Sequence, residues 1–331
     1  YTVSKLKFWG PYGSKMQNEV LREIAPPGLL RGCWWGGYLS EPRDGYIDRL
    51  WRFLVTGAAN TDLWYTLEPG STMGAFNGAF EAAPYAVRIL PHLNALRWGS
   101  GQQLVVTPML RQGLALWYSH ESNRASEIDE RMVQPGESQN ALIDFCYRHG
   151  LGLEIITKNR LDRLAAAKVV FLFGANALTD AEIEALKVFV DGGGLVVADM
   201  PPAFMNAYMI ANKQNPLAGL FGETTLATCG EAHMAPLRLD GEYPLAAAAV
   251  KTIKGIPQVN ARTVGKGETV LLNFTLSTAW DTAADPAAFD RFLLALLARR
   301  GIAPQVEVRA TTADRALVRI RCGSGFDLVS M

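Results

Sequence analysis

The sequence predicts an α/β protein, in which strands alternate with helices along most of the chain. Apolar stretches of strand length, such as residues 29–39 and 61–67, are followed by segments with apolar residues at helical spacing. The same alternation resumes near residue 114 and continues to about residue 200. It indicates parallel strands joined by crossover helices. Short alternating segments after Pro304 are instead typical of antiparallel β structure.

Three helices and two strands are expected in the first hundred residues. Apolar residues from Met16 to Ile24 recur at helical spacing, and Pro26-Pro27 is a stop signal. Apolar residues from Ile47 to Val55 follow the i, i+3, i+4, i+7, i+8 pattern of an amphipathic helix. The expected elements are helices over residues 14–25, 47–57 and 85–96, and strands over residues 29–39 and 61–67.

A second series of strands and helices follows a Gly-rich polar break at residues 98–103, which we interpret as a linker. Thr179 is expected to cap a strong helix that ends at Gly192-Gly193-Gly194. The expected strands are residues 114–118, 153–157, 169–173 and 195–198, and the expected helices are residues 138–148 and 179–191. This order predicts an open, doubly wound sheet.

The last third of the chain changes to short β segments from about residue 222. Residues 264–268 read as a hairpin turn between two strands, and residues 289–301 as a helix. Three further segments, residues 306–309, 317–320 and 326–329, look like the opening of an all-β domain. The chain begins without Met and stops in a strand-like segment, so we expect a piece of a longer polypeptide. The expected domains are residues 1–100, 101–303 and 304–331.

Composition excludes several classes of protein. The 331 residues contain 32 Lys plus Arg and 32 Asp plus Glu, a balance that argues against a nucleic-acid partner. No stretch of about 18 consecutive apolar residues occurs, which argues against a membrane span. The cysteines lie far apart, so free thiols are expected rather than a zinc or disulfide scaffold. They are Cys33, Cys146, Cys229 and Cys322.

The second strand–helix series carries no motif for chemistry or for a cofactor. Asp199-Met200-Pro201 follows the apolar strand at residues 195–198 and offers no nucleophile, and GxSxG and P-loop motifs are absent. The glycines at 192–194 precede a strand, so they fail the dinucleotide fingerprint. The four histidines lack metal-ligand spacing. We expect a scaffold or interface domain without cofactor or metal, and a small ligand at the switch point of the sheet is the weaker alternative.

Two carboxylates in the first hundred residues are candidates for chemistry. Glu41 and Glu68 each come directly after an apolar strand, and in a parallel β/α barrel the active site lies at that end of the strands. A carboxylate there can attack an oxocarbenium-like centre while a second carboxyl serves as acid. The alternative for Glu41 is a loop ion pair with Arg43. The Asn18-Glu19 pair is set aside, because it falls on the polar face of the first helix.

Aromatic residues gather at the same strands. Trp34, Trp64 and Tyr65 lie on or at the ends of expected strands, where aromatic rings can stack on sugar faces or fill a core. Both interpretations stay open for each ring. Trp51 falls on the apolar stripe of its helix and is expected to pack in the core.

In their order along the chain, several segments resemble the second half of a glycoside hydrolase family 42 (GH42) β-galactosidase. The most specific match runs from Ala177-Leu178-Thr179-Asp180 to Phe189-Val190-Asp191-Gly192-Gly193-Gly194-Leu195-Val196-Val197. The other matching segments are Arg49-Leu50-Trp51 to Gly57-Ala58, Trp64-Tyr65, Leu114-Ala115-Leu116-Trp117-Tyr118-Ser119, Val264-Gly265-Lys266-Gly267-Glu268 and Leu297-Ala298-Arg299-Arg300-Gly301-Ile302.

The resemblance implies a partial (β/α)8 barrel, then a flavodoxin- or amidotransferase-like trimerisation domain, then the start of a small β domain. It implies retaining hydrolysis of β-galactosides or related β-glycosides, a homotrimer and a cytoplasmic location. Glu41 matches the family's nucleophile after the seventh strand, although another alignment puts Tyr38 there. Trp34, Tyr38, Trp64 and Tyr65 would line the sugar site, and the acid/base residue would lie outside this chain. The alternative is a non-catalytic carbohydrate-binding or scaffold protein that lost the nucleophile.

Overall fold

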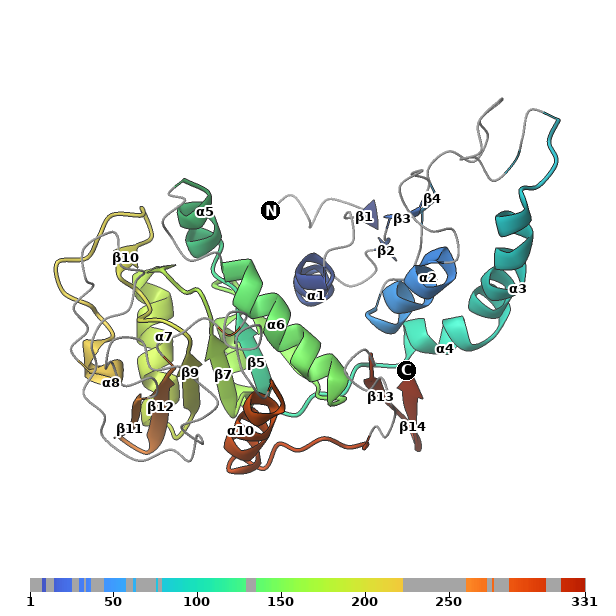
Figure 1. The fold of residues 1–331 in the computed structure, drawn as a ribbon. Helices are drawn as coiled ribbons and strands as arrows, with labels where there is room; N and C mark the ends of the chain where they lie inside the picture. Colours follow the sequence, from blue (N-terminus) through green and yellow to red (C-terminus); the bar gives the residue numbers. More distant parts are fainter. Residues whose placement is uncertain are drawn as a thin grey trace. The chain divides into compact units, whose positions relative to one another are not determined.

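The computed structural model divides into two compact units, each described here by itself (Figure 1). The first comprises Tyr1–Leu110 and Arg309–Met331, and the second comprises Arg111–Val308. The structure describes residues 8–9, 15–25, 30–32, 34–36, 45–57, 62–63, 76, 79–128, 135–222, 260–272, 276, 286–307 and 317–330.

A six-stranded sheet in the order β11-β12-β9-β7-β5-β6 forms the second unit. Five of its strands are parallel and β11 is antiparallel at the edge. Counted along the chain, the parallel strands have the order 2-1-3-4-5, one of the two common doubly wound orders. The strands are β5 (Leu114–Trp117), β6 (Leu153–Ile156), β7 (Val169–Leu172), β9 (Leu195–Ala198), β11 (Asn260–Val264) and β12 (Gly267–Leu271). The predicted parallel α/β sheet is confirmed.

Helices cover this sheet, so its strands are buried on both faces, as parallel strands require. Ile183, Leu186 and Val190 of one helix pack on alternate residues of β5, β7 and β9 in a single apolar cluster. The helices are α5 (His120–Ile128), α6 (Pro135–Arg148), the 3-10 helix η2 (Leu161–Ala166), α7 (Asp180–Asp191), α8 (Ala218–Phe221) and α10 (Pro286–Ala298). Two further short strands, β8 (Ala177–Leu178) and β10 (Met205–Asn206), pair in parallel. The sequence analysis did not predict α5.

Helix α7 begins at the predicted cap. The backbone N–H of Glu182 donates to Oγ1 of Thr179 at 3.3 Å, and the N–H of Thr179 donates back to Oε2 of Glu182 at 2.9 Å. This reciprocal pair is a capping box. Glu182 is fully buried, and its Oε1 also accepts the indole N–H of Trp117 at 3.1 Å. The cap therefore also anchors α7 to β5.

The predicted hairpin is formed by β11 and β12, with Gly265 at φ +57° in the turn. The N–H of Glu268 donates to the carbonyl of Gly194 at 3.0 Å, which aligns β12 with β9. The other β segments expected between residues 222 and 259 lie outside the described residues.

Two pairs of short parallel strands and four helices are described in the first unit. The strands are β1 (Phe8–Trp9) with β2 (Leu30–Arg31), and β3 (Trp34–Gly36) with β4 (Asp62–Leu63). The helices are α1 (Lys15–Ile24), α2 (Gly45–Val55), α3 (Pro84–Trp98) and α4 (Ser100–Val106). Leu50, Phe53 and Leu54 of α2 share one apolar cluster with Tyr85 and Leu104. Parallel strands packed with helices agree with the predicted α/β class.

The break at residues 98–103 is helical and not a linker, so that prediction is wrong. Helix α3 ends at Trp98 and α4 begins at Ser100. A Cβ on Gly101 would lie 2.3 Å from the carbonyl oxygen of Leu96, so only glycine lets the two helices meet this closely. Gly101 therefore allows a tight corner between two helices. Composition alone does not distinguish such a corner from a flexible linker.

The last strands, β13 (Arg319–Gly323) and β14 (Phe326–Ser330), form an antiparallel hairpin that belongs to the first unit. The N–H of Leu110 donates to the carbonyl of Ile320 at 2.9 Å. Arg321 donates from Nη2 to the carbonyls of Leu54 and Val55 at the end of α2, at 3.0 Å each. The division into three domains, with a separate domain beginning at residue 304, remains a prediction.

Glu19 is fully buried, and its expected place on a polar helix face is wrong. It pairs with Arg22 at 2.7 Å and with Arg319 of β13 at 3.2 Å. A buried carboxylate needs such partners, since an unpaired charge is costly to desolvate. The hairpin therefore supplies one of the two cations that pair with the buried Glu19.

Candidate functional site

The residues predicted to form the site lie in or after two strands that pair in parallel. Strands β3 and β4 pair in parallel, with Trp34 opposite Asp62 and Gly36 opposite Leu63. Parallel neighbours have their carboxyl ends at the same edge of a sheet. Trp64 follows Leu63 directly in the sequence. The carboxyl ends of β3 and β4 therefore lie side by side, at Gly36 and Leu63.

For Trp34 the structure describes the backbone within β3. The other predicted site residues lie outside the described residues, and their roles remain predictions. They are Tyr38, Glu41, Trp64, Tyr65 and Glu68.

Helix α2 follows β3 along the chain and packs its apolar face into the core of the unit, as a β/α unit requires. Trp51 is half-buried against this core, as predicted, and donates its indole N–H to Nδ1 of His92 on α3 at 3.0 Å. Arg321 satisfies two carbonyls at the end of the same helix. These contacts fix α2 against α3 and the hairpin β13–β14.

Asp199 is a fully buried carboxyl at the carboxyl edge of the sheet in the second unit. Asp199 follows β9, and its Oδ1 accepts the N–H groups of Gly174 and Met200 at 2.9 Å each. Burial raises the pKa of Asp199 to about 6, and hydrogen bonds from Gly174, Ser138 and Met200 oppose that rise. Because Ser138 lies on α6 and Gly174 follows β7, the carboxyl ties three elements together. The sequence analysis named Asp199 only as a residue that is not a nucleophile.

Two serines near the switch point between β5 and β7 form hydrogen bonds with β8. The hydroxyls of Ser119 and Ser122 donate to the carbonyl of Ala177 at 2.7 and 2.9 Å. The N–H of Ala177 donates to Oγ of Ser122 at 2.9 Å. Ligands of doubly wound sheets bind in the crevice at this point, and here the two serines join the segment after β5 to β8.

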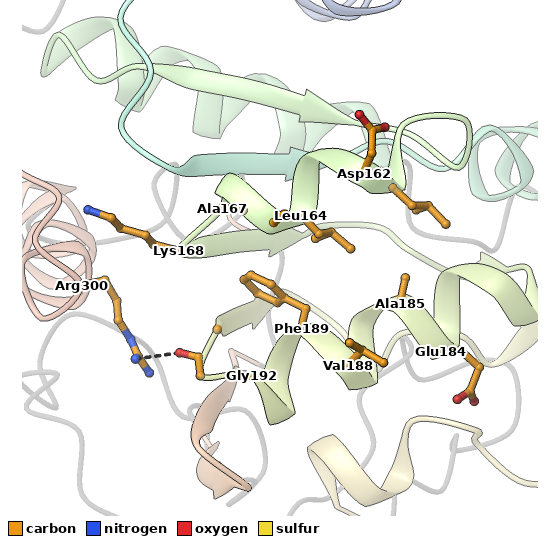
Figure 2. Close-up of a pocket in the computed structure, with 14 residues that line it drawn as sticks. Asp162, Leu164, Ala167, Lys168, Glu184, Ala185, Val188, Phe189, Gly192 and Arg300 are labelled. Atoms are coloured by element: carbon orange, nitrogen blue, oxygen red, sulfur yellow. Dashed lines mark hydrogen bonds between the residues drawn. The ribbon is translucent and has the colours of Figure 1, made fainter.

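A cavity lies at the opposite edge, where the parallel strands begin. Its lining includes Lys168, which precedes β7, and Gly194, which precedes β9 (Figure 2). Among the described residues no group of three His, Cys, Asp or Glu side chains is placed to hold a metal ion. Within the same residues, no helix has both the length and the apolar character that crossing a membrane requires.

Comparison with solved structures identifies the fold of the chain. No family model matches the chain, and no curated protein matches it. Solved structures do match: a β-galactosidase from Bacillus circulans sp. alkalophilus has a TM-score of 0.72 at 16% identity, over 97% of this chain and 53% of its own. A catalytic mutant of a GH42 β-galactosidase from G. stearothermophilus has a TM-score of 0.69 at 14% identity, over 95% of this chain and 49% of its own.

The β-galactosidase from the haloarchaeon Halorubrum lacusprofundi also matches, with a TM-score of 0.63 at 14% identity, over 94% of this chain and 49% of its own. The chain therefore spans about half the length of the structures it matches. At this identity the likeness establishes the fold. The resemblance to part of a GH42 β-galactosidase, predicted from the residues, is confirmed at that level.

Proposed function

We propose that the chain is part of a retaining glycoside hydrolase that acts on β-galactosides or related β-glycosides. The observation that carries the proposal is the likeness in fold to GH42 β-galactosidases over almost the whole chain. The parallel pairing of β3 with β4 supports it, since barrel enzymes carry their chemistry at the carboxyl ends of such strands.

In the proposed mechanism the Glu41 carboxylate attacks the anomeric carbon and forms a covalent glycosyl-enzyme intermediate. A carboxylic acid on sequence outside these residues, about 5–5.5 Å away, protonates the leaving oxygen and then activates the water that releases the sugar. Trp34, Trp64 and Tyr65 would present aromatic faces to the apolar side of the sugar. Tyr38 takes the place of Glu41 in the alternative alignment, and Glu68 is the weaker candidate for the nucleophile.

The second unit would serve assembly. Residues 101–303 would be a trimerisation domain without chemistry of its own, and residues 304–331 would begin a small β domain. The sequence of this unit supports the role, because it carries no motif for chemistry or for a cofactor.

The test is cleavage of p-nitrophenyl β-D-galactoside by the natural full-length protein and by two carboxyl variants. Glu41→Gln should lose turnover by about 10⁴-fold or more, because the amide cannot form the covalent intermediate. Glu68→Gln, the matched control, should keep most of the activity. Wild-type-like turnover in Glu41→Gln contradicts the assignment of the nucleophile.

Rescue by azide distinguishes a variant that has lost only its nucleophile from one that has lost its fold. In Glu41→Ala, azide should restore turnover and give the α-galactosyl azide, since it enters the vacated space in one displacement. Absence of rescue in a folded variant contradicts the role of Glu41. Saturable galactoside binding without turnover by the unaltered protein instead identifies the non-catalytic alternative.

A further inference from the structure

The cavity at the amino edge of the second unit has the size of a small-molecule site. Helix α7, η2 and the turn at residues 192–194 line an open cavity of about 770 Å³ (Figure 2). Pockets for small molecules span roughly 300–1,000 Å³. The sugar site proposed above belongs to the first unit, so this cavity is independent of it.

One wall of the cavity is apolar and built around an aromatic ring. Phe189, Leu164 and Val188 line it, and Val188 is 70% exposed. A Cβ on Gly194 would lie 2.3 Å from Cε1 of Phe189, so the ring packs directly against this glycine. Figure 2 shows the Phe189 ring between Leu164 and the turn. The apolar wall is therefore held in place by tight packing.

The two carboxylates of the lining are already neutralised by neighbours. Glu184 pairs with Lys187 at 2.7 Å, and Asp162 pairs with Arg160 at 3.5 Å. Both carboxylates lie on the same side of the cavity in Figure 2. They leave little negative charge to attract a cation.

The two cations of the lining are less well compensated. Lys168 is exposed, and its ammonium has neither an ion-pair nor a hydrogen-bond partner within the described part of the chain. Arg300 donates to the carbonyl of Gly193 at 3.0 Å and contacts Oε2 of Glu268 at 3.3 Å. That same oxygen accepts a bond from Arg299 at 2.9 Å. Glu268 is thus shared between two guanidinium groups, and the lining cation that no carboxylate of the described residues pairs with is Lys168.

We propose that this cavity binds a small amphipathic carboxylate. The apolar body would cover Phe189, Leu164 and Val188, and the carboxylate would accept hydrogen bonds from Lys168 and Arg300. Figure 2 shows Lys168 and Arg300 together on the side away from Glu184. The carboxylate and the apolar part of the ligand would therefore bind at different ends of the cavity. A charge-assisted hydrogen bond gives the head its affinity, and burial of the apolar body adds to it.

Calorimetric titration of the whole chain with octanoate tests the proposal, with 1-octanol and acetate as probes that lack the head or the body. Octanoate should bind saturably at one site per chain, and both other probes at least tenfold more weakly. Lys168→Gln should weaken octanoate binding about tenfold. Lys213→Gln, an exposed lysine of the same unit outside the cavity, should leave binding unchanged.

A second variant tests the apolar wall. Val188→Glu places a carboxylate in the path of the ligand at an exposed position, so the fold should persist while octanoate binding falls at least tenfold. Three results overturn the proposal: no saturable octanoate binding, equal affinity for octanoate and octanol, or unchanged affinity in Lys168→Gln.

Discussion

Glu19 and Arg319 form a buried ion pair across 300 positions of the sequence, with 3.2 Å between Oε1 and Nη2. Glu19 is fully buried and Arg319 is 3% exposed. Arg22 approaches the same carboxylate at 2.7 Å. The pair joins the first helix to the hairpin near the end of the chain, which explains why residues from both ends form one unit.

Removing one partner of this pair should destabilise the first unit strongly. Glu19→Gln removes the buried carboxylate that Arg319 and Arg22 share, and we expect a loss of about 3–5 kcal/mol in the free energy of unfolding. Asp48→Asn breaks the exposed pair with Arg52, where both side chains are at least 46% accessible, and should cost less than about 1 kcal/mol. Urea unfolding of the chain measures both. Equal losses in the two variants would show that the buried pair adds nothing.

Two glycines should respond in opposite ways to alanine. A Cβ on Gly267 would lie 2.1 Å from the carbonyl oxygen of Val190 and 2.5 Å from that of Gly194, both backbone atoms that cannot turn away. Gly267→Ala should cost about 3 kcal/mol. Gly136, in the first turn of α6, has nothing within 4 Å of its Cβ position, so Gly136→Ala should stabilise by about 0.5–1 kcal/mol. Melting temperatures of the two variants check the signs, and a stable Gly267→Ala protein contradicts the packing described.

Asp199 should make the second unit less stable as the pH rises. Its pKa in the folded chain is raised from 3.8 to about 6, so the folded state holds a proton that the unfolded state has released. Stability linked to this group is therefore fully present below pH 3.8 and is lost as the pH rises to about 6. The shift corresponds to about 3 kcal/mol.

Asp199→Asn removes this titration while its amide oxygen can still accept the N–H groups of Gly174 and Met200. The variant should gain stability over the wild type, by up to about 3 kcal/mol, between pH 4 and pH 7. Urea unfolding at each pH gives the difference. A difference that stays constant across this range rules out a raised pKa at Asp199.

Asp290 should show the opposite trend. Burial raises its pKa, but hydrogen bonds from His149 at 2.8 Å and Arg148 at 3.0 Å outweigh burial and hold the pKa below 3.8. Stability from this group is present above the unfolded pKa and is lost as the pH falls through the folded one. Asp290→Asn should therefore destabilise at pH 7 and have less effect near pH 3. The same unfolding series measures it, and equal effects at both pH values contradict the prediction.

The sequence predicted best where local signals agree with the fold. The cap at Thr179, the stripe of α7 and the strands around it were correct because periodicity, capping and turn residues all point the same way. The linker predicted at residues 98–103 was wrong, because a glycine at a tight corner between two helices cannot be distinguished in sequence from a glycine in a linker. The prediction that Glu19 lies on a polar helix face was wrong for a different reason. Glu19 is buried together with Arg319, and no local sequence pattern indicates a partner 300 positions away.

For the candidate site, sequence order predicted that two parallel strands would bring their ends together, and β3 and β4 do so. The cavity at Lys168 and Arg300 was not predicted, since its charged residues come from separate elements that meet only in the folded sheet. Whether Lys168 has an ion-pair partner depends on where the folded chain places the carboxylates, and spacing along the chain does not encode this.

The central claim is that Glu41 is the nucleophile of a retaining glycosidase. The most direct test treats the natural full-length protein with a 2-deoxy-2-fluoro-β-D-galactosyl fluoride, which traps the covalent intermediate, and locates the label by peptide mass spectrometry. We predict a single fluorogalactosyl group on Glu41, with activity lost in proportion to labelling. A label on Glu68 or on another carboxylate, or full inactivation with Glu41 unlabelled, would contradict the account.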